Sequence, residues 1–314
     1  MFKGARPTDL AGLLGLASRA TIDHAYPYTR VGHEMEVERS VARIVGAASL
    51  PRKGETLAVV LKNDDGLGGL AFVRGAKDSS SWEIEHLLIP PDNGDLCAEL
   101  LPQLSRQLRP KKGTNVFLRL SDDSPIVDSV GSAGFRGYAE EELYVRPAGD
   151  RAERGMPEGV SVWELTEPAD FRLFRLHTSC SPVEMRAADG MTLREWQESL
   201  ATRWIDVRKT TDIVASTNGV EQIGWVRFGQ VGSNAVIARC AASSEQPEAI
   251  EALIESVIQS SGRSRTIQFL TPSYDGATAR ALLSRGFRSE ATYRSFSYQM
   301  GQRVLEGAFA PAGL

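Results

Sequence analysis

Residues that hold metal ions or form disulfides are scarce in this chain of 314 residues. Its three cysteines and four histidines are far apart in the sequence: Cys97, Cys180, Cys240, His24, His33, His86 and His177. An odd number of separated cysteines, with no second Cys or His at ligand spacing, predicts reduced thiols instead of disulfides or a zinc site. We therefore expect no metal ion.

Long apolar runs and an excess of basic charge are also absent. No stretch approaches the roughly 20 apolar residues that a membrane helix needs, and the first residues lack the pattern of a cleaved signal peptide. A net charge of −4 and a sequence pI near 5.7 disfavour a protein that binds phosphate backbones. We expect a cytoplasmic protein with no nucleic-acid partner and no membrane partner.

One short motif occurs twice, at positions separated by close to half of the chain. The sequence Gly-Phe-Arg stands at 134–136 and again at 286–288, each time after a short helical pattern and before a β-rich segment. Such a repeat predicts a duplicated domain. Residues 148–159 are rich in Pro, Gly and charge without apolar periodicity, which is typical of an exposed linker. The sequence therefore predicts an N-terminal domain over 1–147 and a C-terminal domain over 160–314.

Hydrophobic spacing predicts the same order of elements in both halves. In the first half we expect helices over 10–20, 34–47 and 96–108, and strands over 5–9, 56–61, 69–74, 82–89 and 115–120. In the second half we expect helices over 170–178, 193–204 and 247–260, and strands over 160–165, 212–216, 222–228, 235–240 and 266–270. The repeat thus covers nearly the whole chain.

This order, with a Gly-Phe pair near the end of each copy, resembles the GNAT superfamily of acyl-coenzyme-A-dependent N-acyltransferases. The resemblance is carried by residues 133–135 and 285–287, together with Gly69 and Gly224 near the start of the strand after each hairpin. It implies an α+β fold class with a mixed α/β sheet, built as two tandem GNAT-like domains. Each domain is expected to be a twisted, mostly antiparallel sheet flanked by helices.

The resemblance also implies acetyl-CoA as co-substrate. In such folds a central strand diverges from its neighbour, and the loop that follows offers backbone N–H groups to the pyrophosphate. The corresponding positions here are Leu88, Ile89, Asn93, Gly94 and Asp95 in the first half, and Cys240, Gln246 and Ala249 in the second. Both loops depart from the family's Gly-rich pattern. The alternative interpretation of residues 245–248 is that they only start a helix, where their negative charges interact favourably with the helix dipole.

Acid–base chemistry at this site requires two further residues. The family's tyrosine, which protonates the departing thiolate, is replaced by Val130 and Leu282, although Tyr274 lies earlier on the same segment. Glu83 and Glu85 share one face of the expected central strand, so either is a candidate general base if that face lines a cleft. If the face is solvated, they are the polar side of a half-buried strand.

Two functions from different classes follow. The first is an N-acyltransferase in which an amine attacks the acetyl-CoA thioester directly, with a small-molecule or peptide amine as acceptor. The second is a non-catalytic tandem GNAT scaffold that acts as a ligand-binding or protein-interaction module. An exposed sheet edge would also allow a homodimer.

Overall fold

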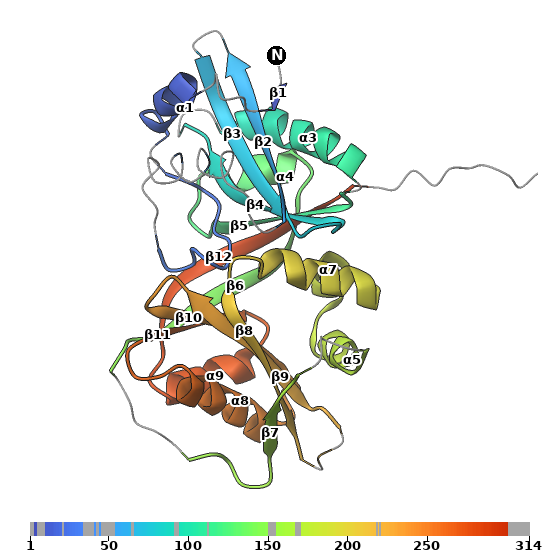
Figure 1. The fold of residues 1–314 in the computed structure, drawn as a ribbon, viewed down its shortest axis with the longest axis vertical. Helices are drawn as coiled ribbons and strands as arrows, with labels where there is room; N and C mark the ends of the chain where they lie inside the picture. The colour runs from blue at the N-terminus through green and yellow to red at the C-terminus, as the bar shows by residue number, and fades with distance from the viewer. Residues whose placement is uncertain are drawn as a thin grey trace, which may run out of the picture.

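The computed structural model describes residues 3–4, 10–20, 22–33, 41, 44, 54–63, 66–90, 94–111, 113–149, 155–166, 171–217, 219 and 221–300. The two halves of the chain are stacked along the long axis of the molecule (Figure 1). The α-helices are α1 (Leu10–Ala17), α3 (Leu96–Leu108), α4 (Val127–Ser132), α5 (Phe171–Cys180), α6 (Val183–Asp189), α7 (Leu193–Arg203), α8 (Pro247–Ser260) and α9 (Gly276–Ser284).

The strands follow the duplicated order. In the first half they are β1 (Lys3–Gly4), β2 (Glu55–Asn63), β3 (Gly66–Gly75), β4 (Ser81–Leu88), β5 (Asn115–Ser121) and β6 (Arg136–Arg146). In the second half they are β7 (Ser161–Glu164), β8 (Arg208–Ser216), β9 (Gly224–Val231), β10 (Ala235–Ala242), β11 (Thr266–Pro272) and β12 (Arg288–Gln299). The α+β fold class expected from the sequence is confirmed.

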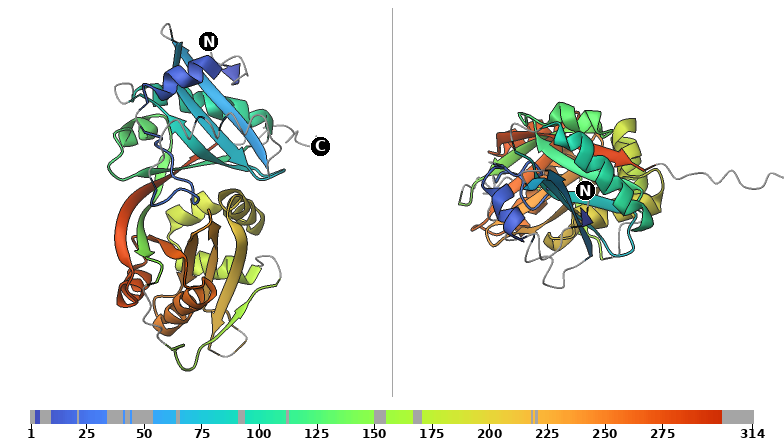
Figure 2. Two further views of the ribbon diagram at one scale, coloured as in Figure 1. Left: turned by 60° about the vertical axis from the view of Figure 1, so that its left-hand side comes forward. Right: turned by 90° about the horizontal axis from the view of Figure 1, so that it is seen from above.

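Among the described residues, twelve strands form a single sheet, in the order β1-β2-β3-β4-β5-β12-β6-β11-β10-β9-β8-β7. The last strand of each half pairs with the other half: β12 is antiparallel to β5, and β6 is antiparallel to β11. β12 and β6 also pair with each other and cross the waist of the molecule side by side (Figure 2). The sequence did not predict this reciprocal exchange of strands between the halves.

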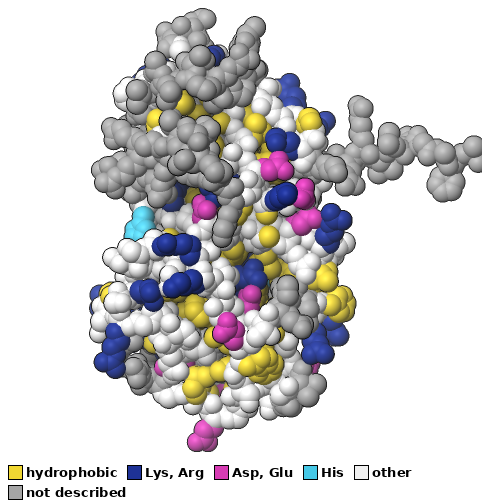
Figure 3. Space-filling model, viewed as in Figure 1, with side chains coloured by type: hydrophobic (Ala, Val, Ile, Leu, Met, Phe, Trp, Pro, Cys, Tyr) yellow, Lys and Arg dark blue, Asp and Glu magenta, His cyan; other side chains and the backbone are white. Residues whose placement is uncertain are grey.

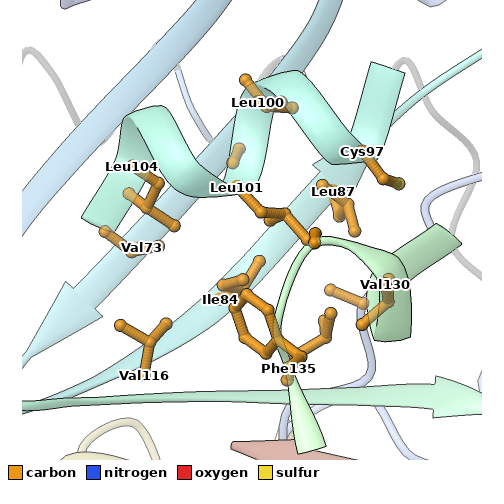
Figure 4. Packing of buried hydrophobic residues seen from close by; sticks show 14 of the residues in the cluster. Val73, Ile84, Leu87, Cys97, Leu100, Leu101, Leu104, Val116, Val130 and Phe135 are labelled. Atoms are coloured by element: carbon orange, nitrogen blue, oxygen red, sulfur yellow. The ribbon is translucent and has the colours of Figure 1, made fainter. Parts of the chain in front are cut away.

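Each half has its own hydrophobic core beneath its helices. In the first half, α3 lays an apolar stripe on the sheet, and Leu101 points from the helix toward Ile84 on β4 (Figure 4). In the second half, α8 and α9 cover one face of the sheet in the same way. A further core lies on the opposite face of the second half and includes Tyr28 from the first half. The halves are therefore joined by shared packing as well as by strands.

The two Gly-Phe pairs have the same role in each half. Gly134 and Gly286 follow α4 and α9 with positive φ angles of 94° and 80°, a left-handed conformation that glycine adopts without strain at helix ends. The next residues, Phe135 and Phe287, are buried in the two cores. The motif thus ends a helix and anchors the start of the exchanged strand.

Buried charges also join the exchanged strands. The Glu141 carboxylate on β6 accepts a hydrogen bond from Arg119 Nε on β5 at 2.8 Å, and another from Ser295 Oγ on β12. The side chains of Arg119 and Glu141 are almost fully buried. The neighbouring arginine holds the pKa of Glu141 below its usual value against the opposing effect of burial.

The order of elements agrees with the sequence analysis, with local differences. The predicted limits of α3 and α8 match the structure, whereas α6 was not predicted. The predicted strand over 5–9 and most of the predicted helix over 34–47 lie outside the described residues. In the part of the chain that is described, no helix is both long and apolar enough to span a membrane.

Replacing Glu141 with alanine tests the joint between the halves. Because Glu141→Ala leaves Arg119 buried without its carboxylate, we expect a loss of roughly 3–5 kcal/mol in the free energy of unfolding, measured by denaturant titration. The control is Glu140→Ala, an exposed neighbour on the same strand, which is expected to change stability by less than about 0.5 kcal/mol. Equal effects of the two variants would contradict the role of the buried pair.

Candidate functional site

In both halves, two parallel strands start together and then diverge. β4 pairs with β5 only over residues 81–83, and β10 pairs with β11 only over residues 235–238. We call the space where β4 and β5 diverge the first slot, and the space where β10 and β11 diverge the second slot. A diverging pair exposes main-chain N–H and C=O groups that an extended ligand can pair with.

The first slot is filled by the chain itself. Residues 23–26 run between the two strands: His24 N–H donates to Leu87 O at 3.0 Å, and Tyr26 N–H donates to Arg119 O at 2.9 Å. In return, Leu87 N–H donates to Asp23 Oδ1 at 3.0 Å, and Arg119 Nη1 donates to Tyr26 O at 2.9 Å. The main-chain groups that would meet a ligand are therefore already bonded.

This inserted segment is held by buried charges. The Asp23 carboxylate contacts Arg30 Nη1 at 2.5 Å and His86 Nδ1 at 2.6 Å, and all three side chains are buried. These partners hold the pKa of Asp23 far below its usual value although burial acts in the opposite direction. Tyr28, which follows in the same segment, is fully buried and accepts a hydrogen bond from Arg239 of the second half at 3.1 Å.

In the second slot, unlike the first, no backbone segment among the described residues lies between the two strands and hydrogen-bonds to them. A small cavity of about 20 Å³, enough for a single water molecule, lies at the divergence of β10 and β11. Its lining comes from α5 and the turn after it, β9, β10 and the turn after β11: His177, Cys180, Ser181, Trp225, Arg239, Cys240, Ala241, Ala242, Tyr274 and Asp275.

A larger groove lies next to this cavity. Its volume is about 930 Å³, and it runs between α5, the loop before β9 and the loop that joins β10 to α8. Three arginines line it, Arg172, Arg175 and Arg186, together with Phe171 and Phe174. Figure 3 shows basic and hydrophobic side chains close together where α5 lies in Figure 1. The groove therefore combines positive charge with apolar surface.

The ligand residues predicted in the first half lie at the filled slot or in the core. Leu88 and Ile89 are fully buried, and Leu88 forms a β-bridge with Asp23. Gly94 and Asp95 lie just before α3, where Gly94 O accepts a hydrogen bond from the helix. Asn93 lies outside the described residues. Their role as ligands stays a prediction, at a place where the chain already supplies the pairing strand.

The ligand residues predicted in the second half are divided between the open spaces and the core. Cys240 lines the cavity of the second slot, and Gln246 lines the groove and immediately precedes α8. Ala249 is fully buried in the core beneath α8. Of the three, only Gln246 therefore faces a space large enough for a ligand.

The predicted bases, Glu83 and Glu85, lie on a face that is neither solvated nor an open cleft. α7 of the second half packs on β4, and Thr202 on α7 donates to Ser81 O at 3.0 Å. Glu85 contacts Arg74 Nη2 at 3.3 Å. Burial raises the pKa of Glu83 to about 8, although Arg119 and Arg203 oppose the increase. Their catalytic role stays a prediction, and the cavities described above are lined by other residues.

Comparison with known proteins identifies the architecture. No family model and no curated protein sequence matches the chain. A tandem GNAT protein from the clavulanic acid biosynthesis pathway is 12% identical, with a TM-score of 0.51 over 96% of this chain and 99% of the other. A GCN5-related N-acetyltransferase from Sphaerobacter thermophilus is 12% identical, with a TM-score of 0.51 over 95% of both chains. The chain has the tandem GNAT fold.

Several residues that line the second slot and its groove were not predicted from the sequence. Arg172, Arg175 and His177 belong to α5, which the sequence predicted as a helix over 170–178 without a role for these side chains. His177 and Ser181 are four residues apart, a spacing that places two side chains on one helical face. Within the described residues, no group of three or more His, Cys, Asp or Glu side chains is placed to hold a metal ion.

The raised pKa of Glu83 predicts a specific pH dependence of stability. With a pKa of about 8 in the folded protein and 4.5 as the ordinary value, the folded state binds this proton more tightly, so stability falls as pH rises from about 4.5 to 8. Glu83→Gln removes this loss. We therefore expect the variant to gain a few kcal/mol relative to the wild type between pH 5 and pH 9, at roughly 1.4 kcal/mol per pKa unit.

Denaturant titration at several pH values provides the measurement. The matched control is Glu85→Gln, two residues along the same strand, which breaks the contact with Arg74. It is expected to lower stability without the pH-dependent gain. A pH-independent difference between Glu83→Gln and the wild type would rule out the raised pKa.

Proposed function

We propose that this protein is an acyl-CoA-dependent N-acyltransferase of the cytoplasm, in which only the second half binds the acyl donor. The proposal rests on the difference between the slots: the chain's own segment fills the first, whereas the second opens on a cavity and a basic groove. Acetyl-CoA is the proposed donor, and a small-molecule or peptide amine is the proposed acceptor.

The second half offers main-chain groups for the pantetheine arm of the donor and arginine side chains for its phosphates. Beyond residue 238, the edge of β10 that faces the slot is not paired with β11. Its main-chain N–H and C=O groups can form hydrogen bonds with the amide groups of the pantetheine arm. Arg172, Arg175 and Arg186 carry positive charge into the adjacent groove, where they suit the phosphates of coenzyme A. Arg186 Nε is buried there and has no hydrogen-bond partner among the described residues.

The proposed reaction is a direct attack. The lone pair of the amine forms a bond to the thioester carbonyl carbon, the C–S bond breaks, and the sulfur leaves with the electron pair. Tyr274 lines the slot and is 44% exposed, so its hydroxyl can reach a bound thioester. Burial raises the pKa of the Tyr274 phenol, which therefore carries a proton at neutral pH for the departing sulfur.

The first slot is a poor competitor for the same donor. A ligand there would have to break the four hydrogen bonds between residues 23–26 and the two strands. At a net value of roughly 1 kcal/mol each, this cost corresponds to about a 10³-fold loss of affinity. A filled first slot is also expected of a non-catalytic scaffold. The two functions differ in whether the second half binds the acyl donor.

Calorimetric titration with acetyl-CoA is the direct test of donor binding. We expect one binding event per chain, because only the second slot is open. No heat and no shift in melting temperature at millimolar ligand would reject the acyltransferase and favour the scaffold. Two equivalent sites per chain would show that the inserted segment leaves the first slot.

Charge reversal in the groove tests the phosphate contacts. Arg175→Glu removes one favourable contact with a phosphate and adds repulsion, so we expect acetyl-CoA affinity to fall by about 10- to 100-fold, and by less at high salt. The control is Arg106→Glu, an exposed arginine on α3 of the first half, which is expected to leave affinity within twofold. Equal affinities of the two variants would place the phosphates elsewhere.

A further inference from the structure

A chain of polar side chains lies along one wall of the second slot. His177 is on α5, and Ser181 follows one helical turn later, with its Oγ 3.2 Å from His177 Nδ1. On the other side lies Tyr274, where Ser181 acts against the increase that burial causes in the pKa of the phenol. His177, Ser181 and Tyr274 all line the cavity between β10 and β11. The hydroxyl of Ser181 therefore lies between the imidazole, to which it is hydrogen-bonded, and the side of the cavity where the phenol stands.

The far end of this chain is a fixed carboxylate. Asp189 Oδ2, at the end of α6, lies 3.4 Å from His177 Nε2. Asp189 is itself held by Arg203 Nη2 on α7 at 2.7 Å, with Arg239 of β10 at 3.7 Å. Neither Asp189 Oδ2 nor His177 Nε2 has a hydrogen-bond partner among the described residues, so the influence of Asp189 is electrostatic. Its negative charge beside Nε2 favours the tautomer that carries the proton there, which leaves Nδ1 as the acceptor facing Ser181. Trp196 on α7 stacks on the imidazole ring at 5.6 Å and fixes its orientation.

The surroundings keep His177 neutral. Its ring is 4% exposed, and the charged groups that face it are Asp189 and Arg186 of α6, Arg203 of α7 and Arg239 of β10. Burial lowers the pKa of His177 to about 4, with Asp189 opposing the decrease and the three arginines adding to it. The imidazole is thus uncharged at physiological pH, and its Nδ1 lone pair faces the Ser181 hydroxyl.

We propose that Ser181 and His177 are the proton relay that deprotonates the acceptor amine, and that the same relay resupplies Tyr274. The inference rests on the proposed acyl transfer. As the C–N bond forms, the amine proton passes to Ser181 Oγ while the Ser181 hydroxyl proton passes to His177 Nδ1. As the C–S bond breaks, Tyr274 donates its proton to the leaving sulfur. His177 then returns its proton through Ser181 to the Tyr274 oxygen.

This cycle balances without another reactant. One proton leaves the amine nitrogen, one proton reaches the sulfur of coenzyme A, and all three side chains end in their starting states. In this scheme Asp189 does not accept a proton. It is a positioning residue that fixes the tautomer of His177, and Arg203 and Arg239 stabilise its charge.

The test compares Ser181→Ala, Ser181→Thr and His177→Asn with the wild type. Acetyl-CoA is the donor, and release of the coenzyme A thiol is followed with an alkylamine, an arylalkylamine, a polyamine, a peptide N-terminus and water as acceptors. We expect Ser181→Ala and His177→Asn to lose about 10²-fold in kcat, which is within the range of general acid–base catalysis. Ser181→Thr restores the hydroxyl and is expected to stay within about fivefold of the wild type.

Donor binding, measured by calorimetry in each variant, separates this inference from the proposed function. The relay predicts a loss of kcat with acetyl-CoA affinity within twofold of the wild type, whereas failure of the wild type to bind acetyl-CoA rejects the proposed function itself. His177 is buried, so its replacement can unfold the protein. The Ser181 variants therefore decide the test, because Ser181 is partly exposed. Ser284→Ala, which removes a similar hydroxyl at the end of α9, is the control.

Two outcomes would overturn the relay. The first is a Ser181→Ala variant that keeps its kcat within twofold of the wild type. The second is a wild-type protein that binds acetyl-CoA but releases coenzyme A no faster than buffer with every acceptor, including water. The first outcome rejects the relay alone, whereas the second also rejects the proposed acyl transfer although the donor site remains.

Discussion

The exchange of strands between the halves is the constraint on which the rest of this structure depends. β12 of the second half lies between β5 and β6 of the first, so neither half completes its sheet alone. A continuous sheet fixes the relative position of the halves through backbone hydrogen bonds, and the buried ion pair of Arg119 and Glu141 links β5 to β6 within it. This rigid joint brings α7 of the second half onto β4 of the first and carries Tyr28 of the first half into the core of the second.

The duplicated domains are alike in fold but unlike in their slots. In the first half, residues 23–26 occupy the position of a ligand strand, and Asp23, Arg30 and His86 hold them there with buried charges. In the second half, the corresponding space is bordered by polar side chains and leads to a groove with three arginines. One copy thus supports the architecture, while the other retains open space, positive charge and titratable groups in one place, which is the combination expected of a ligand site.

The sequence predicted helices and strands well where the local pattern alone sets them. The apolar spacing of α3 and α8 is strong enough that their limits match, and the two Gly-Phe pairs mark helix ends because only glycine is unstrained at those φ angles. Glu83 illustrates the opposite case. Strand alternation placed it correctly on one face, but what covers that face is α7, more than a hundred residues away in the chain. His177 lies on the helix predicted over 170–178 and Ser181 lies just after it, and their local sequence does not indicate that they share a cavity with Tyr274.

The sequence by itself determined the duplication, the fold class and the order of the elements, because each depends on residues close together in the chain. The tertiary structure decided which half keeps an open slot, since that depends on where residues 23–26 lie relative to β4 and β5. It also decided which titratable groups meet, because His177, Asp189 and Tyr274 come from α5, α6 and the turn after β11. Local propensity carries no information about such long-range contacts, whose energies arise only when the whole sheet is assembled.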